Sequence, residues 1–307
     1  MLWLLLIESV LQMITNKFNL PQPLVDAVTR EYEYKEKQYS VTSLLKGTRE
    51  AILLRRHHKE IDQDVSDMIW LIFGTAVHSI LENTKESFFE IKENKLIVDL
   101  PNGYKISGQF DLYNFELAKI TDWKTAAVWK VIFNDWDDYK KQTLLYCWMQ
   151  EQKGLPAREG EIVALLKDWS KTKAKFDKNY PQHPVHKESW LFTDEDLENI
   201  YKWLLEKFAE IERCEQLPDH ELPLCSAEER WAEAPKFAVM KQGNKRAIKN
   251  YETREEAEQR VQELGLNYYV EERKGVDKKC SEYCSCCEFC DYYKQNYKET
   301  KAEETNE

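Results

Sequence analysis

The segment from residue 95 to residue 124 constrains the fold most, because it reads as three consecutive strands joined by tight turns. A Pro-Asn-Gly turn at 101–103 separates the strands 95–100 and 104–114, and a third strand follows at 117–124. Side chains alternate between the two faces of a strand, so Phe110 and Asp111 point to opposite sides. Asp122 and Lys124, two residues apart, share one face of the third strand. A chain built around this meander requires a sheet.

Helical patterns surround the meander on both sides. One helix is expected from Ser40 or Thr42, as its N-cap, through Leu53 into a basic stretch, and a second from Val65 to Phe89, whose apolar stripe is expected to be buried. A helix at 135–151, an apolar strand at 162–166 and an amphipathic helix at 193–214 follow. The order predicts an α/β (α+β) fold with a mixed central sheet flanked by helices.

Composition bounds the class of protein. With 307 residues, 42% of them hydrophobic, the chain can bury a sizeable core, and its formal charge is 44 − 55 = −11. That charge argues against a protein that coats nucleic acid, but it permits a local basic groove. The apolar start, residues 1–13, is too short to span a bilayer and lacks a basic n-region, so a cytoplasmic protein without membrane contact is expected. The first twelve residues are read as an upstream extension or a short packed helix.

The chain is expected to divide into five segments. These are an N-terminal leader at 1–38, a core at 39–235 that includes a basic loop, a small ββαβ insertion at 236–275, a cysteine cluster at 276–297 and a disordered tail at 298–307.

Asp111, Asp122 and Lys124 are the groups that metal-assisted phosphodiester hydrolysis requires. Carboxylates on adjacent strands can bind magnesium, and an ammonium beside them can orient a water and offset developing negative charge. For Asp122 and Lys124 alone, an ordinary solvated strand face is the favoured reading. The motifs that surround these residues favour a catalytic role instead.

Four motifs occur in order along the chain. They are Gly74-x-x-x-His78 on a helix, Asp111 on a strand, Asp122-x-Lys124 on the next strand and Gln142-x-x-x-Tyr146 on a helix. Together they resemble the RecB-like branch of the PD-(D/E)XK nucleases, which includes iron-sulfur and phage-type exonucleases. The resemblance covers roughly residues 39–170.

The resemblance implies a restriction-endonuclease-like core and a Mg²⁺- or Mn²⁺-dependent deoxyribonuclease, with exonuclease preferred over endonuclease. It implies that His78 is a metal ligand and that Gln142 and Tyr146 contact the DNA backbone or position Lys124. DNA is the implied partner, a recombination or replication protein is a compatible one, and phage origin fits. The alternatives are a catalytically silent DNA-binding or recombination accessory protein of the same fold, and an interaction protein organised by zinc.

The cysteines are crowded near the C-terminus, with five of eight between 280 and 290. In a cytoplasmic chain such crowding favours a metal over disulfides. Iron-sulfur relatives place one further cysteine near residues 40–47, which this chain lacks, and Cys287 or Cys286 could replace it. The predicted set of Cys280, Cys284, Cys287 and Cys290 would hold Zn²⁺ or a [4Fe-4S] cluster, and a reduced tail without metal is the plain alternative.

Two groups of basic residues are candidates for phosphate contact. The first lies in the loop after the strand 162–166 and the second on the helix that follows Ser40. The residues are Lys171, Lys173, Lys175, Arg49 and Arg55.

Overall fold

The computed structural model describes residues 14–29, 33–85 and 87–298, so the expectations for the N-terminal extension and for the tail after residue 298 lie outside the described residues. The chain divides into two compact units. The first comprises Met1–Lys46 and Arg55–Gln216, and the second comprises Gly47–Leu54 and Leu217–Glu307. This division passes through α3 (Thr48–His57) and assigns residues 217–235 to the second unit, whereas the sequence grouped them with the segment 39–235.

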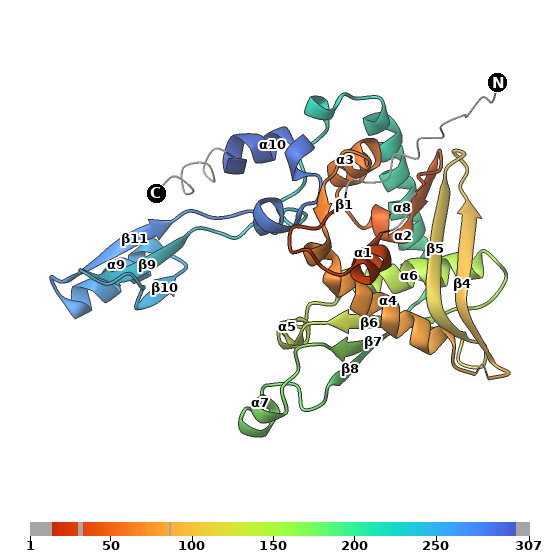
Figure 1. Ribbon diagram of the computed structural model, residues 1–307, viewed down its shortest axis with the longest axis horizontal. Helices are drawn as coiled ribbons and strands as arrows, with labels where there is room; N and C mark the ends of the chain where they lie inside the picture. The colour runs from red at the N-terminus through yellow and green to blue at the C-terminus, as the bar shows by residue number, and fades with distance from the viewer. Residues whose placement is uncertain (1–13, 30–32, 86, 299–307) are drawn as a thin grey trace. The chain divides into compact units, whose positions relative to one another are not determined.

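A six-stranded mixed sheet forms the centre of the first unit (Figure 1). Its strands are β2 (Gln38–Ser40), β4 (Glu90–Asp99), β5 (Lys105–Asn114), β6 (Lys119–Ala126), β7 (Glu159–Leu166) and β8 (Val185–Leu191). The order is β2-β5-β6-β7-β8, and β4 pairs with β5. β2 is parallel to β5 and β6 to β7, whereas the other pairs are antiparallel. The predicted mixed sheet flanked by helices is confirmed, although β2 and β8 have no counterpart in the sequence prediction.

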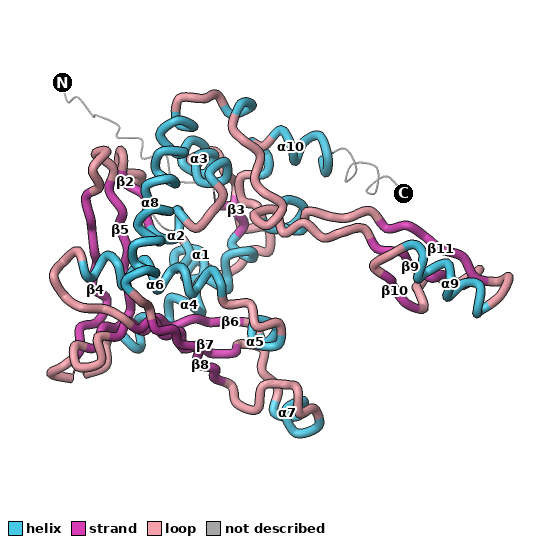
Figure 2. Tube along the Cα trace, turned by 180° about the vertical axis from the view of Figure 1, so that it is seen from behind, coloured by secondary structure: helices cyan, strands magenta, loops and turns pink. Residues whose placement is uncertain are grey.

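Two long helices, α6 (Asp137–Glu151) and α8 (Asp194–Glu215), pack together and complete the main core (Figure 2). A capping box starts α8, because the side chains of Thr193 and Asp196 satisfy each other's backbone N–H groups. Its buried residues recur every three or four positions. These are Leu197, Ile200, Leu204, Phe208 and Ile211, which join Leu145 and Met149 of α6 in the main core.

Shorter elements complete the first unit. These are β1 (Ile14–Thr15), α1 (Gln22–Val28), α2 (Val41–Leu44), β3 (Gln63–Asp64), α4 (Ile69–Glu82), α5 (Val128–Ile132) and α7 (Lys171–Phe176). The single helix predicted after Ser40 is two helices, α2 and α3, which a break at residues 45–47 separates. The basic segment after β7, predicted to be a loop, contains the short helix α7, which Ser170 caps by accepting a hydrogen bond from the Lys173 N–H.

The prediction that the apolar stripe of α4 is buried is wrong. No residue of α4 is buried, and Trp70, Phe73 and Ile80 are more than half exposed. Among the described residues, Val65–Glu82 is the one segment long and apolar enough to cross a membrane by length and composition. Gly74 of this helix lies against Thr125 of β6, and His78 contacts Asp111 of β5. The helix therefore packs against β5 and β6, the two adjacent strands that carry the candidate site.

The second unit contains a small sheet and the cysteine segment. β9 (Lys236–Lys241) lies between β10 (Lys249–Tyr251) and β11 (Tyr268–Arg273), antiparallel to both, with α9 (Arg254–Leu264) packed against them. This is the predicted ββαβ order. The segment 279–293 carries the crowded cysteines and contains a π-helical turn at Lys279–Tyr283, a 3₁₀ turn at Cys287–Phe289 and α10 (Asp291–Tyr293).

Candidate metal centre and active site

β5 and β6 bring the two predicted aspartates to adjacent positions. Their antiparallel pairing ends at Leu112 and Thr121, next to Asp111 and Asp122. Beyond that pair, Asp111 Oδ2 accepts a hydrogen bond of 2.6 Å from the Trp123 backbone N–H, which therefore needs no strand partner. Asp111 and Asp122 are only 5% and 2% exposed. Two buried carboxylates this close in the sheet are costly unless a positive charge compensates them.

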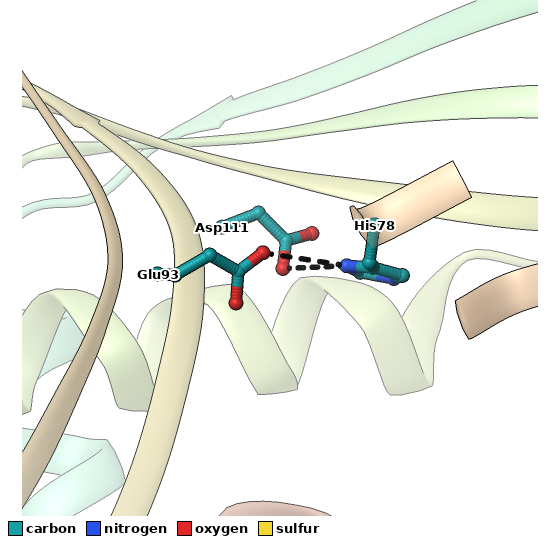
Figure 3. Close-up of side chains that lie close together, drawn as sticks. All are labelled: His78, Glu93 and Asp111. Carbon is teal, nitrogen blue, oxygen red and sulfur yellow. Dashed lines mark ion pairs between the residues drawn. The ribbon is translucent and has the colours of Figure 1, made fainter. Parts of the chain in front are cut away.

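His78 and Glu93 complete a group of possible metal ligands with Asp111 (Figure 3). One ligand atom of each of the three residues lies within 4.8 Å of the other two. His78 Nδ1 is 3.0 Å from Asp111 Oδ1 and 3.7 Å from Glu93 Oε1. The hydrogen bond to Asp111 is the main reason that the pKa of His78 is raised. An imidazole and hard carboxylate oxygens suit Mn²⁺ and Mg²⁺.

Glu93 is the member of this group that the sequence does not reveal. It lies on β4 opposite Asp111, at the position where the pairing of β4 and β5 passes from Lys92–Leu112 to Asn94–Phe110. Its φ of 48° is in the left-handed region, which costs a non-glycine residue about 1 kcal/mol. Gln109 Nε2 donates to Glu93 Oε2 at 2.5 Å and orients the carboxylate. Burial, followed by the charge of Asp111, raises the pKa of Glu93.

Lys124 forms an ion pair with Asp122 on the same strand. Burial is the main reason that the pKa of Asp122 is raised to about 6; Asp111 adds to this rise, while Lys124 and His78 oppose it. Burial alone would lower the pKa of Lys124, but the neighbouring carboxylates of Asp122 and Asp111 raise it, so the ammonium stays charged. The Lys124 Nζ also lies 5.4 Å from the centre of the Tyr139 ring, which supports it from α6.

Gln142 and Tyr146 lie beneath the site rather than on its surface. They are 6% and 3% exposed, and Gln142 Nε2 donates to the Tyr146 hydroxyl at 2.9 Å. The Tyr146 ring fills the space beside Gly108, because a Cβ at Gly108 would lie 2.6 Å from Tyr146 Cε1. Burial first, and the charge of Asp122 second, raise the pKa of Tyr146. These contacts suit the predicted positioning role, and the predicted contact with a DNA backbone stays a prediction.

The predicted basic residues are of two kinds: exposed lysines, and arginines that form hydrogen bonds within the protein. Lys171, Lys173 and Lys175 are exposed on α7. Arg49 is 6% exposed and donates to Cys290 Sγ and to the Leu222 carbonyl, so its guanidinium is engaged within the second unit, and its contact with DNA stays a prediction. Arg55 donates to the carbonyls of Gln38 and Lys35. Its guanidinium also lies 4.7 Å from the centre of the Tyr39 ring. Arg55 therefore has both hydrogen-bond and aromatic contacts within the first unit.

The C-terminal cysteines lie together with one cysteine that the prediction leaves out. Burial is the main reason that the pKa of Cys280 is raised to about 12, and the neighbouring Cys284, Cys225 and Cys290 also raise it. Cys286 is buried and interacts with the Glu50 carbonyl at 3.9 Å and with Cys284 Sγ at 3.6 Å. Cys287 is a neighbour of Lys298. The structure thus brings Cys280, Cys284 and Cys290 together and adds Cys225.

Replacing Glu93 with Gln is expected to weaken Mn²⁺ binding by about tenfold to 100-fold, because a charged oxygen ligand is lost while the side-chain volume is kept. Calorimetric titration of the purified protein with Mn²⁺ measures the change. Glu90→Gln, at the start of the same strand, is the matched control and should bind as the wild type does. Equal affinities for the Glu93 variant and the control would remove Glu93 from the metal centre.

Divalent metal binding is expected to weaken as the pH falls below about 6. The folded-state pKa of Asp122 is about 6, so below that pH a proton occupies the carboxyl and must leave before metal binds. Each pH unit below 6 should then cost about tenfold in affinity, and His78, whose pKa is also raised, adds to the loss. Mn²⁺ titrations at pH 5 and pH 7.5 measure this. The same affinity at both values would show that neither group is a ligand.

No family model and no curated protein matches the chain. Among solved structures, the protein SSO0001 is similar with a TM-score of 0.43 and 17% identity, over 61% of this chain and 82% of that chain. An alkaline exonuclease from Laribacter hongkongensis has a TM-score of 0.33 and 12% identity, over 63% and 95% of the two chains. A phage-related exonuclease from Haemophilus somnus 129PT has a TM-score of 0.28 and 10% identity, over 54% and 77%. Every one of these TM-scores is below 0.5, so the function proposed below rests on the geometry of the site and on the sequence motifs.

Proposed function

We propose that this protein is a divalent-metal-dependent deoxyribonuclease whose active centre is built from His78, Glu93, Asp111, Asp122 and Lys124. One observation supports this most: a His-Glu-Asp ligand group lies beside the buried Asp122, which pairs with Lys124, in a chain whose ordered motifs resemble the PD-(D/E)XK nucleases. Three carboxylates and an imidazole fit Mg²⁺ or Mn²⁺. We propose a location in the cytoplasm and a role in DNA replication, recombination or repair.

Each residue of the centre has a distinct task in this proposal. When bound, a divalent ion supplies charge neutralisation at the phosphate and lowers the pKa of a bound water. His78, Glu93, Asp111 and Asp122 would hold it. Lys124, charged and held against Asp122, can donate a hydrogen bond to the attacking water and offset the negative charge that develops on the phosphate. The Gln142–Tyr146 pair packs beneath these groups. The contact of the Tyr146 ring with Gly108 sets the distance between α6 and β5.

The preference for an exonuclease rests on the resemblance of the Gln142-x-x-x-Tyr146 motif to end-processing relatives. Degradation of end-labelled linear DNA and of closed circular DNA, each with and without Mg²⁺, tests both parts of the proposal. Nucleotide release from linear DNA alone, only with metal, is expected. Cleavage of circular DNA would make the protein an endonuclease. Binding without cleavage of either substrate would favour the accessory protein with a silent site.

Neutralising Lys171, Lys173 and Lys175 is expected to weaken DNA binding and to reduce its dependence on salt. Each lysine that contacts a phosphate releases counterions, so the triple alanine variant should reduce the slope of log affinity against log salt by roughly 2 to 3 for duplex DNA. Turnover at saturating DNA should change less, because phosphate contacts position the substrate. Binding in an Asp111→Asn background, which prevents degradation, measures the slope.

The matched control carries the same loss of charge elsewhere on the first unit. It replaces the exposed Lys17, Lys153 and Lys202 with alanine. If both triple variants show the same slope, α7 has no specific part in DNA binding.

A further inference from the structure

Cys225 belongs to the thiol cluster of the second unit, although Cys280 lies 55 positions further along the sequence. It lies in the segment between α8 and β9, far from the crowded cysteines that the sequence draws attention to. In the structure Cys225 and Cys284 are electrostatic neighbours, and both are neighbours of Cys280, as is Cys290. Four thiols from two separate segments therefore converge.

The Cys225 sulfur lies beside Gly47, the residue that precedes α3. A Cβ at Gly47 would lie 3.1 Å from Cys225 Sγ and 2.9 Å from the Glu229 carboxyl, so glycine leaves the space that this sulfur fills. The Glu50 backbone forms a hydrogen bond with the Cys225 thiol. An N–H group at the first turn of a helix is a favourable partner for a thiolate.

Basic groups surround the same sulfurs. Arg49 Nε donates to Cys290 Sγ at 3.3 Å. Its Nη1 donates to the carbonyl of Leu222, three residues before Cys225, so one guanidinium contacts both segments that carry the thiols. Lys279, paired with Glu50 at 2.6 Å, is an electrostatic neighbour of Cys284 and Cys225. Buried basic groups and N–H donors at sulfur are what an anionic thiolate centre requires.

We propose that Cys225, Cys280, Cys284 and Cys290 are the four thiolate ligands of an iron-sulfur cluster, with Cys225 in place of the cysteine missing before α3. On binding, each thiol gives up its proton and forms one bond to iron. Cys286, whose sulfur lies 3.6 Å from that of Cys284 and donates to the Glu50 carbonyl, is then outside the ligand set, and so is Cys287. The proposal is independent of the centre at Asp111.

The spacing of the sulfurs favours a cluster over a single zinc ion. Tetrahedral Zn²⁺ with Zn–S bonds of about 2.3 Å needs its four sulfurs about 3.8 Å apart. Within the described part of the chain, His78, Glu93 and Asp111 are the one group of three or more possible ligands that comes within 4.8 Å, so no three thiols are that close. A cluster in which each iron binds a different thiolate fits such a wider set.

The test compares single serine variants of the full chain, purified without oxygen. The wild type should be brown and carry about four irons and four sulfides. Cys225→Ser should lose most of the iron, whereas Cys287→Ser, in the same segment as three proposed ligands, should keep it. Full iron in Cys225→Ser, or loss in Cys287→Ser alone, would overturn the ligand assignment. Zinc in place of iron, or no metal in the wild type, would overturn the cluster.

A rescue variant separates ligand loss from misfolding. In Gly47→Cys combined with Cys225→Ala, the new side chain starts 3.1 Å from the position that the Cys225 sulfur occupies. This double variant should regain iron and visible absorption relative to Cys225→Ala alone. If Cys225→Ala folds, as far-UV circular dichroism would show, and the double variant remains free of iron, the sulfur at this position is not a ligand.

Discussion

Lys124→Ala is expected to reduce DNA cleavage by about 10³-fold while DNA binding and the fold are largely kept. The ammonium acts on charge that develops in the transition state, so its removal should lower kcat rather than weaken substrate binding. The fold should survive because Asp122, whose pKa is already about 6, can take up a proton when its partner is lost. Asp122→Ala, which removes a proposed metal ligand, is expected to abolish cleavage.

Single-turnover cleavage of labelled DNA, together with thermal unfolding, measures the effect. Lys119→Ala is the matched control, since Lys119 lies on the same strand but pairs with Glu161 at 3.3 Å, away from Asp122. The control should cleave at the wild-type rate. A Lys124→Ala variant as active as the control would remove Lys124 from the chemistry.

Asp111→Asn is expected to weaken Mn²⁺ binding by more than about 100-fold and to abolish cleavage. Loss of a partner behind a metal ligand already costs about 10-fold to 100-fold, and Asp111 is itself a member of the ligand group. Asparagine keeps the size of the side chain and an oxygen that can accept from the Trp123 N–H, so the connection between β5 and β6 should remain.

The loss should be larger than that of Glu93→Gln, because Asp111 contacts His78 at 3.0 Å and also lies next to Asp122. Calorimetric titration with Mn²⁺ compares both variants with the wild type. An Asp111→Asn variant that binds Mn²⁺ with wild-type affinity would place the metal elsewhere.

The part of the site that lies on two adjacent strands could be predicted from sequence. Period-two alternation places Asp111 on one face of β5 and sets Asp122 and Lys124 on one face of β6, and a short turn leaves little choice of pairing. His78 follows from its motif on α4. Glu93 does not, because its position depends on the register of β4 against β5 and on a left-handed residue within a strand.

One wrong prediction and one unpredicted contact have the same physical origin. The period of α4 predicts which residues share a face, but it cannot say whether another element covers that face, and Trp70 and Phe73 prove to be exposed. Likewise, the charge of Arg49 suggests phosphate contact, whereas its hydrogen bond to Cys290 depends on tertiary packing between segments far apart in the sequence. Cys225 lies in the thiol cluster because segments far apart in the sequence contact each other. Local sequence spacing does not predict such contacts.

The most direct test of the proposed metal centre is the position of Mn²⁺ in crystals of the protein, located by its anomalous scattering. The proposal predicts a peak among His78, Glu93, Asp111 and Asp122, with ligand distances of about 2.0–2.3 Å, and the loss of this peak in Asp111→Asn. A fully occupied peak at another site, with none among these four residues, would contradict it.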